Sequence, residues 1–410
     1  MSQTTPQDSR DPGMVVQSRP VGRSKLAPLV PDSSSSSPSG KPHQKPKVRL
    51  REVTFDDYGP VTALQSKYGL RAKGYEEWKD LWLKNPAFRE YRDSLPMGWV
   101  LESEKHDIFG YLGNIPLIYE LEGRRLLGSV AHAWVVEEDY RSYSLLLLQQ
   151  YFAQKKVDLF LNATVGPLAT EAFAVFESLP VPVGAWDEAS FCITSYSGFL
   201  ASWLQTKQVP FSTPLSYLLG GGLFLKENVL QPRPKSSRIE VQLCTEFDSR
   251  FDTFWENLRH RNSGKLIGLR NREALQWHYG FALQQKELWI VTVESAADIT
   301  AYALFLRYDN PQLRLCRMRL VDFQTLDANP DILAGVFSWA AQKCRKDGIH
   351  MLEYLGFCSE KRDVLDRLAV HKRKMSSWLY YYKSSRPDLA QRLSDPKVWD
   401  PCQFDGDASL

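Results

Sequence analysis

Three side chains at the end of one apolar stretch could act as a general base. His132 stands in the stretch 126–136, which alternates as a strand does, and Glu137 and Glu138 follow directly after it. A histidine exchanges protons near neutral pH, and a carboxylate can also accept one. These residues are therefore candidates for removing a proton from a nucleophile, with His132 preferred. The alternative is that His132 is a core or interface histidine.

Other kinds of reaction centre find no support in the sequence. No two of the six cysteines lie within four residues of each other, so the spacing of a zinc or dithiol motif is missing. The three glycines at 220–222 lack the lysine of a phosphate-binding loop. Asp405 and Asp407 flank Gly406 without the further ligands of a calcium loop, and a flexible C-terminus explains them. The sequence therefore predicts no metal site.

Net basic charge is confined to the start of the chain. The 410 residues carry a net charge of +3, but residues 1–48 hold seven lysines and arginines against three aspartates, which leaves the remainder near −1. Binding to nucleic acid needs a basic surface. DNA is therefore not an expected partner, and tRNA is disfavoured.

The N-terminal residues read as a tail and not as a targeting signal. Residues 1–45 are rich in proline and serine, a composition typical of disorder. They contain no apolar core of a secretory signal, and no later apolar stretch approaches the roughly 20 residues of a membrane-spanning helix. We expect a cytoplasmic protein without a membrane span.

The rest of the chain repeats one order of predicted elements. After an opening strand and helical stretch, each half shows three strands, a helix, a strand, a helix and a last strand. In the first half these are expected at 98–103, 108–121, 126–136, 144–152, 157–162, 168–179 and 191–196. In the second half they are expected at 287–293, 299–307, 313–323, 331–346, 351–357, 361–372 and 378–383. This predicts domains at 46–199 and 238–385, a linker at 200–237 and a C-terminal tail at 386–410.

The order of elements resembles the GNAT (GCN5-related N-acetyltransferase) superfamily. The segment from Val135 to Arg141 resembles the place where a core strand of that family ends and an arginine opens the coenzyme A pyrophosphate loop. The two successive halves are similar in layout to Fem-like transferases and to double-GNAT proteins. The resemblance implies an α+β fold of two tandem GNAT-like domains, each a mixed, mostly antiparallel sheet flanked by helices.

The resemblance also implies a site for acetyl-CoA or another acyl-CoA. Free N–H groups at a strand end and a helix N-terminus suit a pyrophosphate. The pyrophosphate would contact Arg141, Ser142, Tyr143, Ser144 and Leu145, and the pantetheine arm and thioester would lie along the backbone of Trp134, Val135 and Val136. The alternative is a simple turn with a surface arginine.

Three positions of the first half, and the corresponding loop of the second half, depart from the family pattern. Ser144 and Leu146 stand where the family has glycine and a small residue, and Phe176 stands where it has an acidic tyrosine hydroxyl. In the second half, the corresponding loop lacks arginine and glycine, and Asp322 and Asp327 would repel phosphates. We therefore expect only the first half to bind coenzyme A.

Three functions are compatible with these residues. The first is an acyl-CoA-dependent N-acyltransferase whose amine acceptor, on a small molecule, a glycan or a peptide, lies between the two domains. Arg270, Asn271 and Arg272 could line that cleft or belong to a capped surface helix. The second is a Fem-like aminoacyl transferase. The third, favoured by Leu146 and Phe176, is a catalytically degenerate ligand-binding or scaffold protein.

Overall fold

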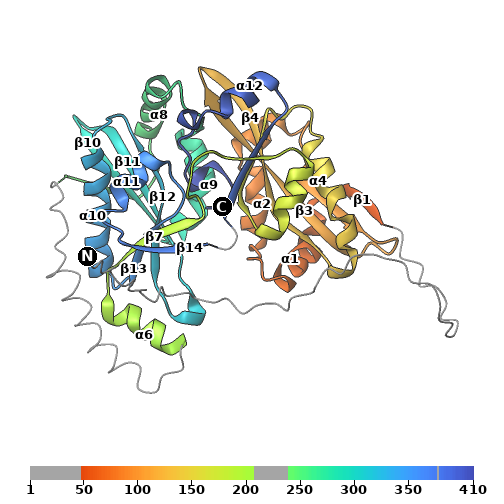
Figure 1. Ribbon diagram of the computed structural model, residues 1–410, viewed down its shortest axis with the longest axis horizontal. Helices are drawn as coiled ribbons and strands as arrows, with labels where there is room; N and C mark the ends of the chain where they lie inside the picture. Colours follow the sequence, from red (N-terminus) through yellow and green to blue (C-terminus); the bar gives the residue numbers. More distant parts are fainter. Residues whose placement is uncertain (1–47, 207–238, 376–377) are drawn as a thin grey trace, which may run out of the picture. The chain divides into compact units, whose positions relative to one another are not determined.

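The computed structural model describes residues 48–206, 239–375 and 378–410. The predicted tail at 1–45 and most of the predicted linker at 200–237 lie outside the described residues. Within the described part, two sheets are flanked by helices (Figure 1). This is the predicted α+β class.

The first sheet is built mainly from the first half of the chain. Its order is β1-β2-β3-β4-β5-β15-β6, with β9 paired to β3, and within it only β4 and β5 run parallel. The predicted strands at 98–103, 108–121 and 126–136 are confirmed. The bounds are β1 (Arg49–Glu52), β2 (Gly98–Glu102), β3 (Ile108–Leu121), β4 (Arg124–Val136), β5 (Leu159–Val165), β6 (Leu179–Pro180), β9 (Ile267–Gly268) and β15 (Leu379–Ser384).

The second sheet repeats this pattern. Its order is β14-β7-β13-β12-β11-β10-β8, and its parallel pair is β12 and β13. The bounds are β7 (Glu188–Ile193), β8 (Gln242–Cys244), β10 (Leu288–Ser295), β11 (Asp298–Arg307), β12 (Arg317–Thr325), β13 (Met351–Tyr354) and β14 (His371–Lys374).

One strand of each half belongs to the sheet of the other half. β7 pairs with β13 in the second sheet, and β15 pairs with β5 in the first. Figure 1 shows β7, in yellow-green, among the blue and turquoise strands. The expectation that 191–196 closes the first sheet and 378–383 the second is therefore wrong. Alternation along a strand reports which faces are buried, but it carries no information on which sheet edge the strand joins.

Helices cover the faces of both sheets. Those of the first half are α1 (Tyr58–Lys67), α2 (Tyr75–Leu83), α3 (Pro86–Tyr91), α4 (Ser144–Phe152), α5 (Thr170–Val175) and α6 (Tyr196–Thr206). Those of the second half are α8 (Arg250–Arg261), α9 (Arg272–Gln284), α10 (Pro330–Lys346), α11 (Ser359–Leu365) and α12 (Pro387–Leu393). Every described helix is too short or too polar to cross a lipid bilayer.

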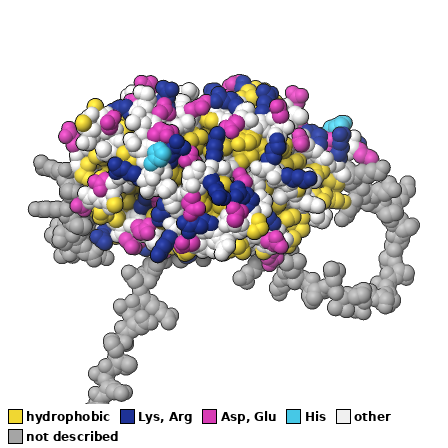
Figure 2. Space-filling model, turned by 90° about the horizontal axis from the view of Figure 1, so that it is seen from above, with side chains coloured by type: hydrophobic (Ala, Val, Ile, Leu, Met, Phe, Trp, Pro, Cys, Tyr) yellow, Lys and Arg dark blue, Asp and Glu magenta, His cyan; other side chains and the backbone are white. Residues whose placement is uncertain are grey.

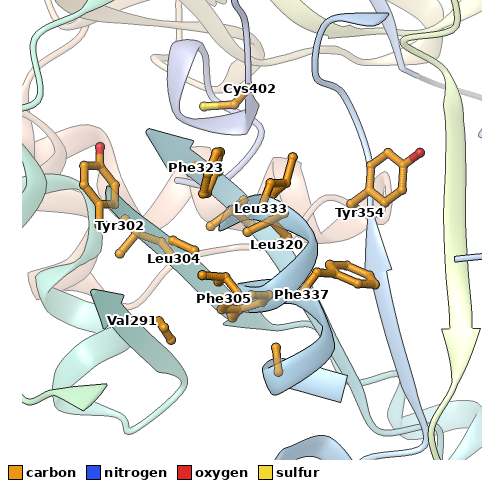
Figure 3. Packing of buried hydrophobic residues seen from close by; sticks show 14 of the residues in the cluster. Val291, Tyr302, Leu304, Phe305, Leu320, Phe323, Leu333, Phe337, Tyr354 and Cys402 are labelled. Carbon is orange, nitrogen blue, oxygen red and sulfur yellow. The ribbon is translucent and has the colours of Figure 1, made fainter. Parts of the chain in front are cut away.

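The predicted amphipathic helix at 331–346 is α10. Asn329 caps it by accepting a hydrogen bond from the N–H of Asp331 at 2.9 Å, and Gly348 follows its end at φ +69°. Leu333 and Phe337 on its buried face point toward Leu320 of β12 (Figure 3). This packing makes the main core of the second half.

The C-terminal residues are buried, so the expectation of a flexible end is wrong. Cys402, Phe404, Asp405 and Ser409 are each at most 5% exposed. The segment 402–410 packs against strands of both sheets: Tyr119 of β3 and Tyr308 after β11 donate hydrogen bonds to its backbone carbonyls at 2.9 Å. Composition alone suggested a tail because the polar and acidic residues of this segment have buried partners that are remote in sequence.

Candidate functional site

The parallel strands β4 and β5 separate halfway along their length. They are paired only from Gly128 to Val130, opposite Leu159 to Leu161. Beyond this point, the side-chain oxygen of Asn162 accepts a hydrogen bond from the N–H of Ala131 at 3.3 Å, in place of a ladder bond. The separation leaves the last residues of β4 without a neighbouring strand on the β5 side. We call this place the β4–β5 opening.

A bulge in β4 lies at the same opening. The register between β3 and β4 shifts by one residue, and Ala133 has φ +53°, a left-handed conformation. A bulge turns neighbouring side chains away from their regular alternation and is frequent beside active sites. Here it re-aims His132 and Trp134, the residues on either side of Ala133.

Three buried polar atoms at the opening have no hydrogen-bond partner among the described residues. They are Nδ1 of His132, Nε1 of Trp134 and Nδ2 of Asn162. The acceptor role of Asn162 toward Ala131 fixes its amide orientation, so its free atom is a donor. Buried polar atoms without partners are costly, and a cluster of them points to a missing ligand.

The C-terminal segment places a carboxylate beside His132. Oδ2 of Asp407 lies 3.4 Å from Nδ1 of His132, within ion-pair distance although the geometry is not that of a hydrogen bond. Thr164 of β5 donates a hydrogen bond to Oδ1 of Asp407 at 3.2 Å. Gly406 fits closely against β5, since a Cβ there would lie 2.8 Å from that of Ala163. A histidine oriented by a carboxylate is suited to accept a proton.

A buried arginine holds this C-terminal segment in place. Arg270 is fully buried and donates to Oδ2 of Asp322 at 3.0 Å and to both carboxylate oxygens of Asp405 at 3.0 Å. Its guanidinium also lies 4.5 Å from the ring centre of Phe404. We call Arg270, Asp322, Cys402 and Asp405 the arginine clamp.

The pKa values of the two aspartates of the clamp are shifted in opposite directions. Burial would raise the pKa of Asp322, but Arg270 and the hydrogen bonds from Cys402 and Tyr302 outweigh burial and hold that pKa below its usual range. Burial raises the pKa of Asp405, and Arg270 offsets only part of the effect.

The predicted acids after β4 do not face the β4–β5 opening. Glu137 accepts hydrogen bonds from Nζ of Lys67 at 2.6 and 2.7 Å and from the hydroxyl of Tyr68 at 2.9 Å. The bond from Lys67 holds the pKa of Glu137 below its usual range. Glu138 is exposed and lies 3.7 Å from Arg141. Glu137 thus fastens α1 to the end of β4, and of the three predicted bases only His132 faces the opening.

The predicted cofactor residues form the end of β4 and the start of α4. Val135 and Val136 are buried, and Trp134 is half-buried with its ring edge-on to Phe173. The 3-10 helix η2 (Glu138–Tyr143) follows, and α4 begins at Ser144, as predicted. The exposed residues of this loop are Arg141, Ser142 and Leu145, whereas Tyr143 and Ser144 are half-buried.

Two departures from the family pattern have a structural outcome. Leu146 is 38% exposed, so its side chain lies at the surface of α4 and not in its packing face. Phe176 caps α5 and stacks on Phe152, with ring centres 5.2 Å apart. The phenyl ring of Phe176 carries no group that could donate a proton.

A cavity of about 840 Å³ lies between α2 of the first half and α9 of the second. Ser409 and Leu410 of the C-terminal segment also line it, as do Lys73, Trp277 and His278. Burial lowers the pKa of Lys73, which pairs with Glu77 at 2.6 Å and is close enough to Asp407 for their charges to interact. Lys73 thus interacts electrostatically with Asp407, although neither Asp407 nor His132 is among the lining residues of the cavity.

The expected cleft residues at 270–272 are divided between different roles. Arg270 belongs to the buried clamp. Asn271 caps α9 by accepting from the N–H of Ala274 at 2.9 Å, and Arg272 lines the cavity. Burial lowers the pKa of His278, one turn further along α9, to about 3, so it stays neutral while its Nε2 bonds Ser409 at 2.8 Å.

Sequence reasoning did not identify Asn162, and it assigned other roles to Asp407 and Arg270. The available signals were a polar residue inside an apolar strand for Asn162 and two acidic residues near the chain end for Asp407. Neither indicates that the two residues meet, because 245 positions separate them along the chain. On the face shown in Figure 2, acidic and basic side chains are intermixed, in keeping with the near-neutral charge of residues beyond 48.

Comparison with known proteins identifies the fold. No model of a protein family and no curated protein sequence matches the chain. Among solved structures, N-myristoyltransferase from Saccharomyces cerevisiae with bound myristoyl-CoA aligns over 85% of this chain and 81% of its own, at 11% identity and a TM-score of 0.53.

Two bacterial structures align as well. A protein from Enterococcus faecalis V583, described as a probable N-acyltransferase, covers 82% of this chain and 72% of its own, at 10% identity and a TM-score of 0.50. A GCN5-related N-acetyltransferase from Anabaena variabilis covers 83% and 73%, at 9% identity and a TM-score of 0.49. The chain shares the fold of the N-myristoyltransferase and of the Enterococcus faecalis protein, with the α+β architecture that its order of elements predicted.

Proposed function

We propose that the protein is an acyl-CoA-dependent N-acyltransferase whose reaction centre is the β4–β5 opening. The observation that carries the proposal is that His132 and Trp134 of β4 and Asn162 of β5 each hold a buried polar atom without a partner where the two strands separate. The fold, which is shared with a myristoyl-CoA-binding protein, supports it.

The acyl-CoA would lie along the end of β4. The residues of β4 after Val130 have no strand beside them on the β5 side, so their backbone groups can pair with the amide groups of a pantetheine arm. The donors Nδ2 of Asn162 and Nε1 of Trp134 are available to a carbonyl oxygen in the same place. Arg141 and the N–H groups at the start of α4 would hold the pyrophosphate.

The chemistry needs one base and no strong acid. The amine nitrogen attacks the thioester carbonyl, the carbon–sulfur bond breaks, and the coenzyme A thiolate leaves. His132 would take the proton of the amine on Nε2, with Nδ1 turned toward Asp407. A thiol with a pKa of about 8.5 leaves as a thiolate without a donor, so Phe176 in place of a tyrosine does not prevent the reaction.

The acceptor would reach the opening through the cavity between α2 and α9. Its volume of about 840 Å³ suits a small molecule or a few residues of a peptide. The walls carry charges of both signs, from Lys73, Glu77 and Arg272 among others. Holding amine and thioester together in this geometry would supply much of the rate.

Calorimetric titration of the full chain with acetyl-CoA and with myristoyl-CoA tests the proposal. We expect micromolar binding of one of them, weakened about tenfold by Arg141→Ala, since an arginine–phosphate contact contributes 1–3 kcal/mol. Arg125→Ala is the matched control, because Arg125 is exposed at the opposite end of the same strand and should leave the affinity unchanged.

Absence of binding to either thioester would overturn the proposal. Binding without transfer to any amine in a broad screen would instead favour a ligand-binding protein, the function that Phe176 also allows. Unchanged binding in Arg141→Ala would show that the pyrophosphate is held elsewhere, and equal loss in Arg125→Ala would show a nonspecific effect of charge.

A further inference from the structure

Three arginines gather on one face of the second sheet, around a single buried carboxylate. Arg317 and Arg319 are two residues apart on β12, so their side chains lie on the same face. Glu353 of β13 stands opposite Arg319 in the register, and Arg373 comes from β14. We call these four residues the arginine cluster.

The single carboxylate cannot neutralise three guanidinium groups. Oε1 of Glu353 accepts from Nε and Nη2 of Arg319 at 2.8 and 2.6 Å, and Oε2 accepts from Arg373. Arg317 lies 3.8 Å from Glu353, beyond hydrogen-bond distance, and donates its Nε proton to the carbonyl of Tyr308 at 2.7 Å. The cluster therefore carries a surplus of two positive charges.

The neighbouring acid does not remove this surplus. Asp309 accepts from Nε of Arg307 at 2.8 Å and from the backbone N–H of Arg317 at 3.0 Å. Its carboxylate is thus used by a further arginine. The clustered arginines have no other carboxylate partner among the described residues.

Some donors of the cluster are free to bind a ligand. Nε of Arg373 is buried and has no hydrogen-bond partner among the described residues. Burial lowers the pKa of Arg317, and the adjacent Arg373 and Arg319 oppose its charge further, although Glu353 supports it. An excess of buried cationic donors is costly unless an anion shares the site. The planar fork of a guanidinium matches a carboxylate or phosphate group.

Tyr308 connects the cluster with the C-terminal segment that carries Asp407. The guanidinium of Arg319 lies 4.0 Å from the ring centre of Tyr308, and the Tyr308 hydroxyl donates to the carbonyl of Ala408 at 2.9 Å. Ala408 is the neighbour of Asp407, which faces His132. Tyr308 and Arg307 also line the cavity between α2 and α9.

We propose that Arg317, Arg319 and Arg373 bind an oxyanion, and that this anion is an acidic group carried by the acceptor amine. The first part stands on the geometry of the cluster, and the second rests on the proposed function. The substrate class is thereby an amine that also carries a carboxylate or a phosphate.

Titration of the full chain with inorganic phosphate and, separately, with succinate tests the site. We expect saturable binding of one probe, weakened at least tenfold in Arg373→Met. Phosphate binding alone assigns a phosphate, and succinate binding alone assigns a carboxylate. The titrations are repeated in Arg141→Ala, so that the proposed pyrophosphate loop does not contribute. No saturable binding of either probe would overturn the inference.

Two variants separate binding from folding. Arg373→Lys keeps the positive charge and removes the planar guanidinium fork. The variant should fold normally, and its affinity for the probe should still fall severalfold. Arg345→Met changes an exposed arginine on α10 and should leave probe binding unchanged. Equal loss in Arg345→Met and Arg373→Met would indicate a diffuse charge effect and contradict a built site.

Acyl-CoA titration of the same samples separates the two proposals. Probe binding without acyl-CoA binding would leave the anion site standing and remove the proposed function. Acyl-CoA binding without probe binding would leave the proposed function standing and overturn the anion site. Where transfer is detected, amines with an acidic group should be better acceptors than their neutral amides, and Arg373→Met should raise KM for the acidic members at least tenfold.

Discussion

In both sheets, the two parallel strands separate after a short paired stretch, and each separation leaves a parting between them. Different side chains lie in the two partings. In the second sheet, β12 and β13 are paired from Arg317 to Leu320 and then separate, as β4 and β5 do in the first. The second parting is filled by the C-terminal segment: Cys402 donates to Asp322, and Gln403 donates to the carbonyl of Leu355 at 3.0 Å. In the first, Nδ1 of His132 and Nδ2 of Asn162 have no hydrogen-bond partner among the described residues, whereas in the second Oε1 of Gln403 has none.

This difference assigns the halves different roles. Asp322 sits inside the second parting and is matched by Arg270, Tyr302 and Gln324. A phosphate or thioester has neither space nor complementary charge there. The same backbone arrangement thus serves as a support in one half and as a candidate reaction centre in the other, and side chains alone decide between the two.

Removing the arginine clamp, which supports the C-terminal segment, should have the largest effect on the free energy of unfolding. Arg270→Met leaves Asp322 and Asp405 buried without their counter-charge, so we expect a loss of about 3–5 kcal/mol in the free energy of unfolding. Urea denaturation followed by tryptophan fluorescence measures it. Arg272→Met, which removes an exposed arginine two residues away, should cost far less. Equal losses would mean that the clamp is not a support.

Breaking the reaction centre should abolish turnover without unfolding the protein. For an acceptor that is turned over, His132→Gln should lower kcat by about 10²–10⁴-fold, the usual contribution of a general base. The urea midpoint should stay close to that of the wild type, because Nδ1 of His132 forms no hydrogen bond with any described residue. A variant with full activity would remove His132 from the mechanism.

The buried His278, which bonds Ser409 of the C-terminal segment, should make the free energy of unfolding depend on pH. The folded-state pKa of His278 is lowered from 6.5 to about 3, so the unfolded chain binds a proton first as the pH falls. Stability should be complete above pH 6.5 and fall by roughly 1.4 kcal/mol per pH unit below it, down to about pH 3. His278→Gln should flatten this slope in urea titrations between pH 7.5 and 5. An unchanged slope would place the dependence elsewhere.

The smallest effect concerns the orientation of the carboxylate. Thr164→Val removes one hydrogen bond to Asp407 and keeps the shape of the side chain. The net value of such a bond is about 1 kcal/mol, so kcat should fall roughly fivefold with KM unchanged. A fall as large as that of His132→Gln would show that Thr164 itself contacts the substrate.

Sequence predicted the local parts of this comparison well. The strands of β2, β3 and β4, the helix α4 and the helix α10 follow from alternation, 3.6-residue periodicity and caps, which are properties of consecutive residues. His132 was selected because its residue type suits the chemistry, and it does lie at the opening.

The nonlocal parts could not be predicted. The exchange of β7 and β15, the meeting of Asp407 with His132, and the clamp between Arg270 and Asp322 all join residues far apart in the sequence. Periodicity indicates which residues are buried, but it does not indicate which distant residues they contact. Arg270 is the clearest case, because a fully buried arginine is exceptional and only its two aspartates explain it.

The exchange of β7 and β15 has a consequence for synthesis of the chain on the ribosome. The first sheet lacks an internal strand until Ser384 has emerged, although β1 to β5 are complete by Val165. During that interval the edge of β5 carries unpaired backbone groups, which favour association with other chains. Neither half should therefore be stable when expressed alone, and the nascent chain has most need of chaperones before β15 is made.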